Sequence, residues 1–218
     1  MTDDNLYKKS YIRRLSELGK LAPDTMKKFT AFDQQALAEG VLSKKTKELI
    51  AVAVAHVTGC PYCIEAHVSS AKRLEVSKEE MLEAIMVATA LKAGSALAHG
   101  VNALNAYDGT GGEELYKRSN KNRLMEFKEI NADSFHAFSL FNHQALKDEL
   151  LSRKEKELIA VAVAHVTGCA YCIDSHTKSA KQLGVTLEEL AESIFVATAL
   201  KAGSALAHSV NALNAYYD

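Results

Sequence analysis

The sequence ELIAVAVAHVTGCPYCIEAH, residues 48–67, decides the fold that we predict for this chain. After Glu48, residues 49–55 are apolar or small on every side, which is typical of a fully buried helix. Gly59 favours the end of that helix, and Pro61 favours the first turn of the next one. The stretch therefore predicts two antiparallel helices joined by a tight turn.

The same stretch returns at residues 157–176 as ELIAVAVAHVTGCAYCIDSH. With an offset of 109 residues, residues 41–107 and 150–216 are identical at 50 of 67 positions. This period is too long for a solenoid and indicates a domain duplication. The turn-rich segment DGTGG separates the two predicted domains, residues 1–108 and 113–218.

The rest of each repeat is also predicted to be helical, because its apolar residues recur at helical spacing without the alternation of a strand. Ser43 is a predicted N-cap, and capping boxes are predicted at residues 77–80, 152–155 and 186–189. The predicted fold class is all-α, in two tandem repeats. In repeat one we expect a helix over residues 6–18, a helix after Pro23, the two hairpin helices, a helix from Ser77 through Leu91, and an alanine-rich helix over residues 95–107.

Composition and charge argue against several classes of partner. The 218-residue chain has a net charge of −1 with acidic and basic residues interspersed, so it lacks the basic surface of a protein that binds nucleic acid or anionic membranes. Its first residues lack the apolar core of a signal peptide, and the longest uncharged run is interrupted by His56, Gly59 and Pro61. We expect a cytoplasmic protein with no nucleic acid and no membrane among its partners.

The predicted hairpin brings four chemically active residues together in each repeat. At about 1.5 Å per residue, Glu48 lies roughly 16 Å from the turn and His67 roughly 12 Å, so the carboxylate is expected to reach the imidazole. Cys60, Cys63 and His67 are three and four residues apart, which places them on one stripe of the second helix. The candidate catalytic residues are Glu48, Cys60, Cys63 and His67 in repeat one, and Glu157, Cys169, Cys172 and His176 in repeat two.

These residue types suit thiol chemistry. A free thiol with a pKa near 8.5 is only about 3% ionised at pH 7, and the N-terminus of a helix stabilises the thiolate. A neighbouring imidazole takes the thiol proton, and a carboxylate behind it orients the ring. A second cysteine then turns an oxidised sulfur into a disulfide. All four cysteines belong to the two CxxC pairs, so none is left for a structural framework.

The pattern E-x11-CxxC-x3-H, complete in both repeats, resembles the signature of the AhpD-like alkylhydroperoxidases in the carboxymuconolactone decarboxylase superfamily. The resemblance implies a cofactor-free and metal-free dithiol that reduces peroxides or disulfides through a Glu–His proton relay, with an external dithiol as reductant. It implies Cys63 and Cys172 as the nucleophiles, each resolved by the first cysteine of its pair. It also implies a homotrimer, in which the helices at residues 95–107 and 204–216 supply the subunit contacts.

The sequence leaves alternatives open. The better-studied alkylhydroperoxidases carry a histidine just before the second cysteine, where this chain has Tyr62 and Tyr171, which suit a substrate-facing role and a packing role equally. A zinc-stabilised binding module would use the same four residues as ligands. A decarboxylase-like protein without peroxidase turnover and an assembly protein with a vestigial site are further alternatives, although the decarboxylase branch lacks the CxxC pair.

Several other polar residues are interpreted as structural. His56 and His165 lie in the last turn of the first hairpin helix, where a cation suits the helix dipole. Lys92, His99 and Asn102 lie in a segment whose small residues favour close helix packing or a subunit interface. We therefore leave all five residues out of the predicted site.

Overall fold

The structure, a computed structural model, describes residues 5–217, and every element in that range is a helix. The predicted all-α class with two tandem repeats is confirmed. Repeat one contains η1 (Lys9–Arg14), α1 (Leu15–Leu21), α2 (Pro23–Leu37), α3 (Lys44–Thr58), α4 (Pro61–Arg73) and α5 (Lys78–Tyr107). Repeat two contains η2 (Arg118–Arg123), α6 (Leu124–Ile130), α7 (Ala132–Leu146), α8 (Arg153–Thr167), α9 (Ala170–Gln182) and α10 (Leu187–Tyr217).

Residues 48–67 form the predicted hairpin. α3 ends at Gly59, whose φ of 69° lies in the left-handed region that glycine enters without steric cost. Cys60 is the N-cap of α4, and its sulfur accepts a hydrogen bond from the backbone N–H of Cys63 at 3.2 Å. Residues 49–55 of α3 are buried on all sides, so the hairpin is anchored in the core.

The predicted helix starts are confirmed. Ser43 accepts a hydrogen bond from the backbone N–H of Thr46 at 3.1 Å. Complete capping boxes begin α5 and α8, and the same reciprocal hydrogen bonds join the residues that begin α10. These contacts satisfy backbone N–H groups that a helix leaves without an internal partner.

Two predicted helix extents are wrong. Residues 77–91 and 95–107 belong to one 30-residue helix, α5, which continues through Gly94. A Cβ atom at Gly94 would lie 3.4 Å from the ring of Phe138, so this glycine provides close contact with α7 and does not end the helix. The predicted helix over residues 6–18 is replaced by two shorter elements, η1 over residues 9–14 and α1 from residue 15, neither of which has a side-chain N-cap.

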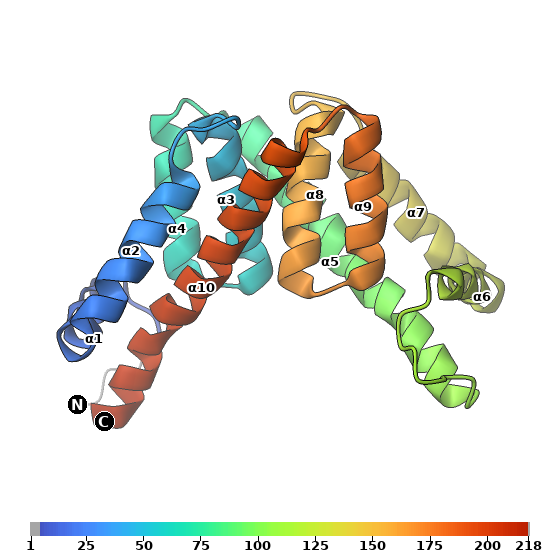
Figure 1. The fold of residues 1–218 in the computed structure, drawn as a ribbon, viewed down its shortest axis with the longest axis horizontal. Coiled ribbons are helices and arrows are strands. Elements are labelled where there is room, and N and C mark those ends of the chain that lie inside the picture. Colours follow the sequence, from blue (N-terminus) through green and yellow to red (C-terminus); the bar gives the residue numbers. More distant parts are fainter. Residues whose placement is uncertain (1–4, 218) are drawn as a thin grey trace.

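The two repeats interlock (Figure 1). α10 packs against α8 of its own repeat and continues across α3, α2, α4 and η1 of repeat one. α5 makes the matching contacts with α8, α7, α9 and η2 of repeat two, so Figure 1 shows each long helix running out beside the other repeat. The hairpin of each repeat is therefore covered by the long helix of the opposite repeat.

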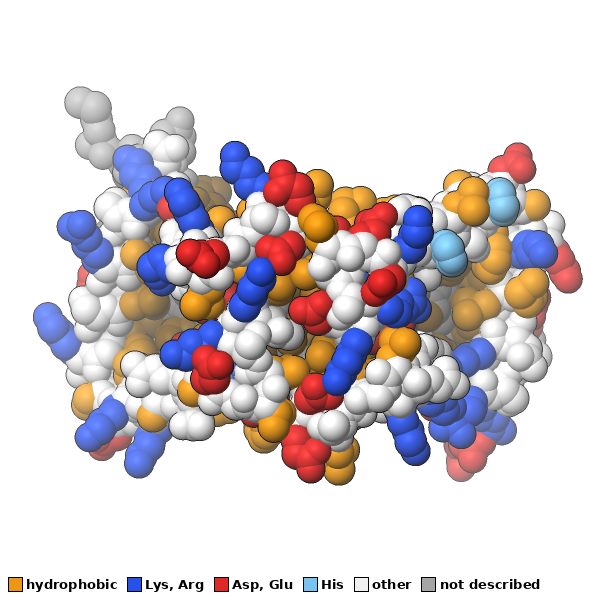
Figure 2. All heavy atoms as spheres, turned by 90° about the horizontal axis from the view of Figure 1, so that it is seen from above, with side chains coloured by type: hydrophobic (Ala, Val, Ile, Leu, Met, Phe, Trp, Pro, Cys, Tyr) orange, Lys and Arg blue, Asp and Glu red, His pale blue; other side chains and the backbone are white. Residues whose placement is uncertain are grey.

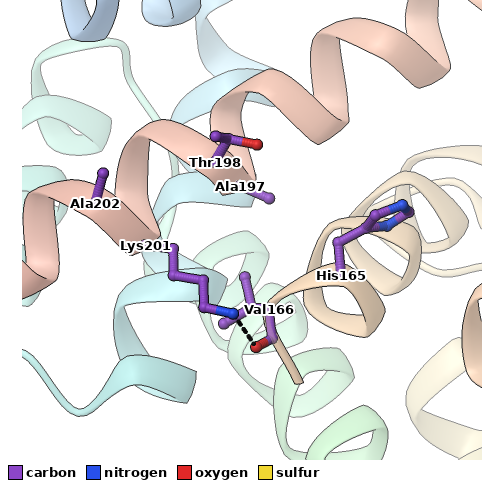
Figure 3. A pocket seen from close by; sticks show the side chains of 6 residues that line it. All are labelled: His165, Val166, Ala197, Thr198, Lys201 and Ala202. Atoms are coloured by element: carbon purple, nitrogen blue, oxygen red, sulfur yellow. Dashed lines mark hydrogen bonds between the residues drawn. The ribbon is translucent and has the colours of Figure 1, made fainter. Parts of the chain in front are cut away.

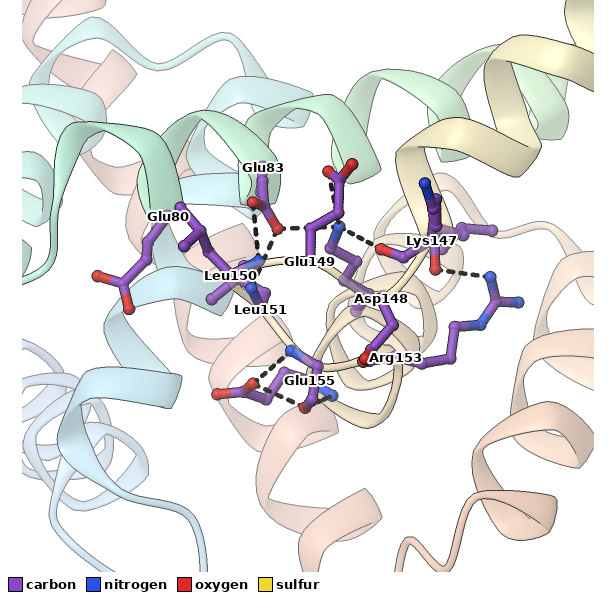
Figure 4. Close-up of polar contacts among 12 residues, drawn as sticks. Glu80, Glu83, Lys147, Asp148, Glu149, Leu150, Leu151, Arg153 and Glu155 are labelled. Atoms are coloured by element: carbon purple, nitrogen blue, oxygen red, sulfur yellow. Dashed lines mark hydrogen bonds and ion pairs between the residues drawn. The ribbon is translucent and has the colours of Figure 1, made fainter.

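Two buried ion pairs join the repeats. Nζ of Lys47, whose side chain is 3% exposed, lies 3.1 Å from the carboxylate of Glu192 on α10. The matching Lys156 lies 2.9 Å from Glu83 on α5. Each glutamate also accepts two backbone N–H groups from the loop before the facing hairpin, as Figure 4 shows for Glu83.

The surface carries charges of both signs. Figure 2 shows Lys and Arg side chains intermixed with Asp and Glu over one face of the molecule, with hydrophobic side chains between them. α5 and α10 have the length and apolar composition of a membrane span. Both are central helices of the interlocked fold, which accounts for their composition.

Candidate active site

The predicted Glu–His contact forms in both repeats. In repeat one, Oε2 of Glu48 on α3 lies 2.8 Å from Nδ1 of His67 on α4. In repeat two, Oε2 of Glu157 on α8 lies 2.7 Å from Nδ1 of His176 on α9. A carboxylate at Nδ1 holds the imidazole in the tautomer that leaves Nε2 available as a base.

The two CxxC pairs are disulfides. Cys60 is bonded to Cys63 and Cys169 to Cys172, with Cα–Cα distances of 5.3 and 5.2 Å. These distances lie within the usual range for a disulfide, so the pairs open and close without a large backbone movement. The second cysteine of each pair is 8% exposed and the first is fully buried. His67 and His176 follow the second cysteines by four residues, on the same helix face.

Each dithiol is covered by the opposite repeat. Cys60 and Cys63 form a buried cluster with Ala55 and with Ala207, which lies on α10. Cys169 and Cys172 form the equivalent cluster with Ala98 and other residues of α5. Each site therefore takes its reactive residues from one repeat and its cover from the other.

Aromatic residues complete both sites. The ring of Tyr171 packs in the cluster of Cys172, and Tyr116 lies 5.4 Å from it between ring centroids. Tyr171 is 4% exposed, whereas Tyr62 is only half-buried in the equivalent place. Burial raises the pKa of Tyr62 and the nearby Tyr7 raises it further, while the backbone N–H of Lys8 has an opposing effect. The sequence reasoning missed the residues before α1, although Tyr7 recurs as Tyr116 in the repeat.

Three pockets lie near the hairpins. A pocket of about 350 Å³ lies beside the first turn of α4, between Tyr7, Ile12 and Tyr62. A second pocket, of about 320 Å³, lies at the end of α8 (Figure 3) and contains none of the predicted site residues. The third is the counterpart of the second in repeat one, at the end of α3. His165 lines the second pocket, and its Nδ1 atom makes a 2.8 Å hydrogen bond to the carbonyl of Val161 in the same helix. This contact supports a structural role for His165.

The carboxylates of the two sites have different partners. Glu157 is fully buried, and its second oxygen accepts a 2.7 Å hydrogen bond from Arg153. The matching Lys44 is exposed and makes no ion pair with Glu48 within residues 5–217. Burial raises the pKa of the Asp33 carboxyl, and the charge of Glu48 raises it further, while His67 lowers it. Asp33 therefore lies close to the Glu48–His67 contact.

The surroundings of the two dithiols differ in a second way. Ile12 packs against the first cysteine cluster, and the matching residue of repeat two is Lys121. Lys121 binds Asp174 at 2.7 Å and Ser175 at 2.8 Å on α9. The first site is therefore more apolar at this position than the second. No group of three or more His, Cys, Asp or Glu side chains within residues 5–217 is arranged to hold a metal ion.

Known proteins are similar to this chain in sequence and in fold. The profile of the Carboxymuconolactone decarboxylase family matches residues 23–106 and again 132–215. An uncharacterised protein of the cox locus of Paracoccus denitrificans is 51% identical over 80 residues, which cover 37% of this chain and 72% of that protein. An uncharacterised Haemophilus influenzae protein is 41% identical over 99 residues, covering 45% of this chain and 88% of that protein.

One solved structure shares the fold over nearly the whole chain. It is a Burkholderia xenovorans protein provisionally named a gamma-carboxymuconolactone decarboxylase subunit. It superimposes with a TM-score of 0.63 over 93% of this chain and 96% of its own, at 20% sequence identity. At this identity the likeness shows the fold and not the reaction.

Proposed function

The chain belongs to the carboxymuconolactone decarboxylase family, and from that premise we propose that it is a thiol oxidoreductase of the alkylhydroperoxidase type. Its two CxxC pairs reduce a peroxide or a disulfide and are themselves reduced by an external dithiol. The observation that carries the proposal is the repeated arrangement of a CxxC pair that closes to a disulfide beside a Glu–His contact. Its cytoplasmic location stays a prediction.

The proposed reaction begins with the second cysteine of each pair. In repeat two, Nε2 of His176 takes the proton of the Cys172 thiol, and Glu157 stabilises the imidazolium that forms. The thiolate attacks the terminal oxygen of a hydroperoxide, and the O–O bond breaks. The leaving alkoxide takes the proton back from His176 as an alcohol, while Cys172 becomes a sulfenic acid.

The second step closes the disulfide. The sulfur of Cys169 attacks the sulfenic sulfur, and the hydroxyl group leaves as water with the proton of the Cys169 thiol. The protein has then lost two electrons to the peroxide, and an external dithiol restores them by thiol–disulfide exchange. Cys63, Cys60, His67 and Glu48 take the corresponding roles in repeat one.

The family name refers to lactone decarboxylation, but the observed side chains favour redox chemistry. A reaction at a lactone carbon gives no reason for two cysteines at disulfide distance in each repeat. A zinc module is a further alternative, because it would use the same residues as ligands. In that case the reduced protein would bind about one metal ion in each repeat.

Intact-mass analysis with thiol labelling tests the proposal. We expect the fully reduced protein to take four N-ethylmaleimide groups, because all four cysteines are in the CxxC pairs. After one treatment with peroxide and removal of excess reagent, we expect it to take none and to have lost about 2 Da per disulfide. Four remaining labels would contradict the proposal, and zinc in protein purified without chelators would favour the metal module.

A further inference from the structure

Buried polar atoms without a partner within residues 5–217 lie on the helices that pack around the two dithiols. In the second site these are the hydroxyl of Tyr171 and Oδ1 of Asn102, and in the first site it is Oδ1 of Asn211, because the backbone N–H of Lys8 donates to the hydroxyl of Tyr62. Buried polar groups in native proteins are nearly always hydrogen-bonded, so an unpaired group requires an explanation. The Oδ1 atom of the matching asparagine is unpaired in both repeats, which makes a chance local defect a poor explanation.

The two groups of the second site come from opposite repeats, on helices that pack together. Tyr171 lies between Cys169 and Cys172 in the sequence of α9 and shares their buried cluster with Ala98. Asn102 follows Ala98 by one helical turn on α5, and α5 packs directly on α9. The reactive sulfur, a hydroxyl donor and an amide acceptor therefore line the same contact between the repeats.

The chemistry of these atoms selects a ligand class. A tyrosine hydroxyl donates a hydrogen bond, and the Oδ1 atom of asparagine only accepts one. A hydroperoxide head group offers an accepting oxygen and an O–H donor on adjacent atoms. Tyr171 is 4% exposed and its ring centroid lies 5.4 Å from that of Tyr116, so its hydroxyl is shielded from solvent.

We propose that Tyr171 and Asn102 bind the O–O–H group of a hydroperoxide beside Cys172. This inference rests on the proposed function and names its substrate. Asn102 accepts the hydrogen of the terminal O–H group, and Tyr171 donates to the oxygen that becomes the leaving alkoxide. Tyr171 keeps its proton, and the alkoxide receives its own from His176. A preorganised donor at an oxygen that gains charge lowers the barrier to reaction.

The assignment revises the sequence-based interpretation of two residues. Tyr171 suited packing and substrate contact equally, and Asn102 was interpreted as a packing residue. A purely packing role would be served better by phenylalanine and leucine, because they leave no buried polar atom unpaired. Retaining the polar atoms is a cost to the fold that a bound substrate offsets.

The test uses Tyr171→Phe in a full-length chain in which Cys60 and Cys63 are replaced by serine, so that only the second site reacts. We expect the second-order rate of Cys172 oxidation by hydrogen peroxide to fall at least about tenfold. The rate of Cys172 alkylation by iodoacetamide, which needs no peroxide binding, should stay the same. The melting temperature should stay the same or rise, because an unpaired hydroxyl is removed. Asn102→Leu should lower the oxidation rate in the same direction.

Matched variants and controls separate the outcomes. Tyr216→Phe in the same single-site background should leave Cys172 oxidation unchanged, since Tyr216 is 82% exposed and lies outside both sites. Unchanged oxidation in Tyr171→Phe would mean that the polar atoms bind water only, and equal losses of oxidation and alkylation would mean a structural role; either result overturns the inference. If the parent chain itself does not react with peroxide while its thiols alkylate normally, the proposed function fails first.

Discussion

Glu48 is the residue whose replacement tests the proposed relay most cleanly, because within residues 5–217 its carboxylate has one hydrogen-bond partner, His67 at 2.8 Å. The equivalent Glu157 also binds Arg153, so its removal would leave a second charge unpaired. A carboxylate beside an imidazole stabilises the imidazolium that forms when the thiol gives up its proton. The two repeats therefore offer the same relay in two electrostatic settings.

We expect Glu48→Gln to raise the pKa of the Cys63 thiol by about one unit, which is about 1.4 kcal/mol less stabilisation of the thiolate–imidazolium pair. The measurement is the pH dependence of Cys63 alkylation, followed by peptide mass analysis. Cys172 in the same sample is the internal control and should keep its profile. An unchanged profile at Cys63 would remove Glu48 from the relay.

We expect Cys63→Ser together with Cys172→Ser to abolish peroxide consumption, because each replacement removes one nucleophile. Either single variant should retain turnover through the other dithiol. Turnover with a reducing dithiol in excess is the measurement. If one single variant lost nearly all activity, the two sites would not work independently.

The contact between a hairpin and the long helix of the opposite repeat is the decisive element of each site. Ala207 on α10 is 6% exposed and packs with Cys60 and Cys63, and Ala98 on α5 has the same place in the second site. Small residues at these positions let a helix approach a buried disulfide closely. The packing around each dithiol thus depends on a helix more than 70 residues away from it in the sequence.

Ala207→Leu should change the alkylation rate of Cys63 and leave that of Cys172 unchanged, although residue 207 belongs to repeat two. The larger side chain overfills a packed cluster, which costs typically 1–3 kcal/mol. Site-resolved alkylation and chemical denaturation measure the two effects. Ala98→Leu is the matched variant and should affect Cys172 instead. Equal effects of both variants on both cysteines would contradict the crossed arrangement.

The ion pair between α3 and α10 predicts a loss of stability in acid. Burial alone would raise the pKa of Glu192, but hydrogen bonds from the Leu42 backbone, from Lys47 and from the Val41 backbone outweigh it and hold the pKa below its ordinary value. A carboxyl with a lowered folded-state pKa contributes stability above its unfolded pKa, about 4.3, and loses it as the pH falls through the folded value.

Glu192→Gln should therefore destabilise the protein more at pH 7 than at pH 3. At neutral pH the loss should be about 3–5 kcal/mol, because Lys47 is left buried without its partner. Urea denaturation at the two pH values measures the difference. The double variant Lys47→Met with Glu192→Gln removes both charges, keeps a side-chain oxygen for the backbone N–H groups of Val41 and Leu42, and should recover much of the loss. A constant destabilisation at both pH values would contradict the role of this ion pair.

At the scale of the whole molecule, the interlocked repeats change where subunits can meet. The helices at residues 95–107 and 204–216 were expected to supply the contacts of a trimer, but they belong to α5 and α10, which pack on the opposite repeat within one chain. Other apolar side chains remain exposed, among them Leu82, Leu187 and Phe195 at 57%, 76% and 56%. A closed ring would bury the same patch in every subunit.

We still propose a homotrimer, now held by these exposed side chains, and expect a solution mass near three times 23.7 kDa by light scattering. Phe195→Asp should lower that mass, because a charge at an apolar contact is costly to bury. A stable monomer at micromolar concentration would contradict the homotrimer and would show that the exposed apolar side chains do not form a subunit contact.

The hairpin, the helix caps and the Glu–His contacts could be predicted from the sequence alone. Each depends on residues fewer than about 20 positions apart on regular helices. Glycine at residue 59, proline at residue 61 and the Ser–Glu capping boxes each act through local backbone geometry. The duplication could also be predicted from the sequence, because the two repeats are identical at most aligned positions. These features needed no knowledge of how the repeats pack.

Which helix covers which dithiol depends on tertiary packing. Gly94 lies between two helices that were predicted separately, but one helix runs through it, and a Cβ atom there would lie 3.4 Å from the ring of Phe138 in the other repeat. Repeats that are nearly identical in sequence have nearly identical apolar helix faces. The spacing of apolar residues therefore does not distinguish a helix contact within one repeat from a contact between the two repeats. The choice rests on the total burial of the core, which includes α3, α5, α8 and α10 together.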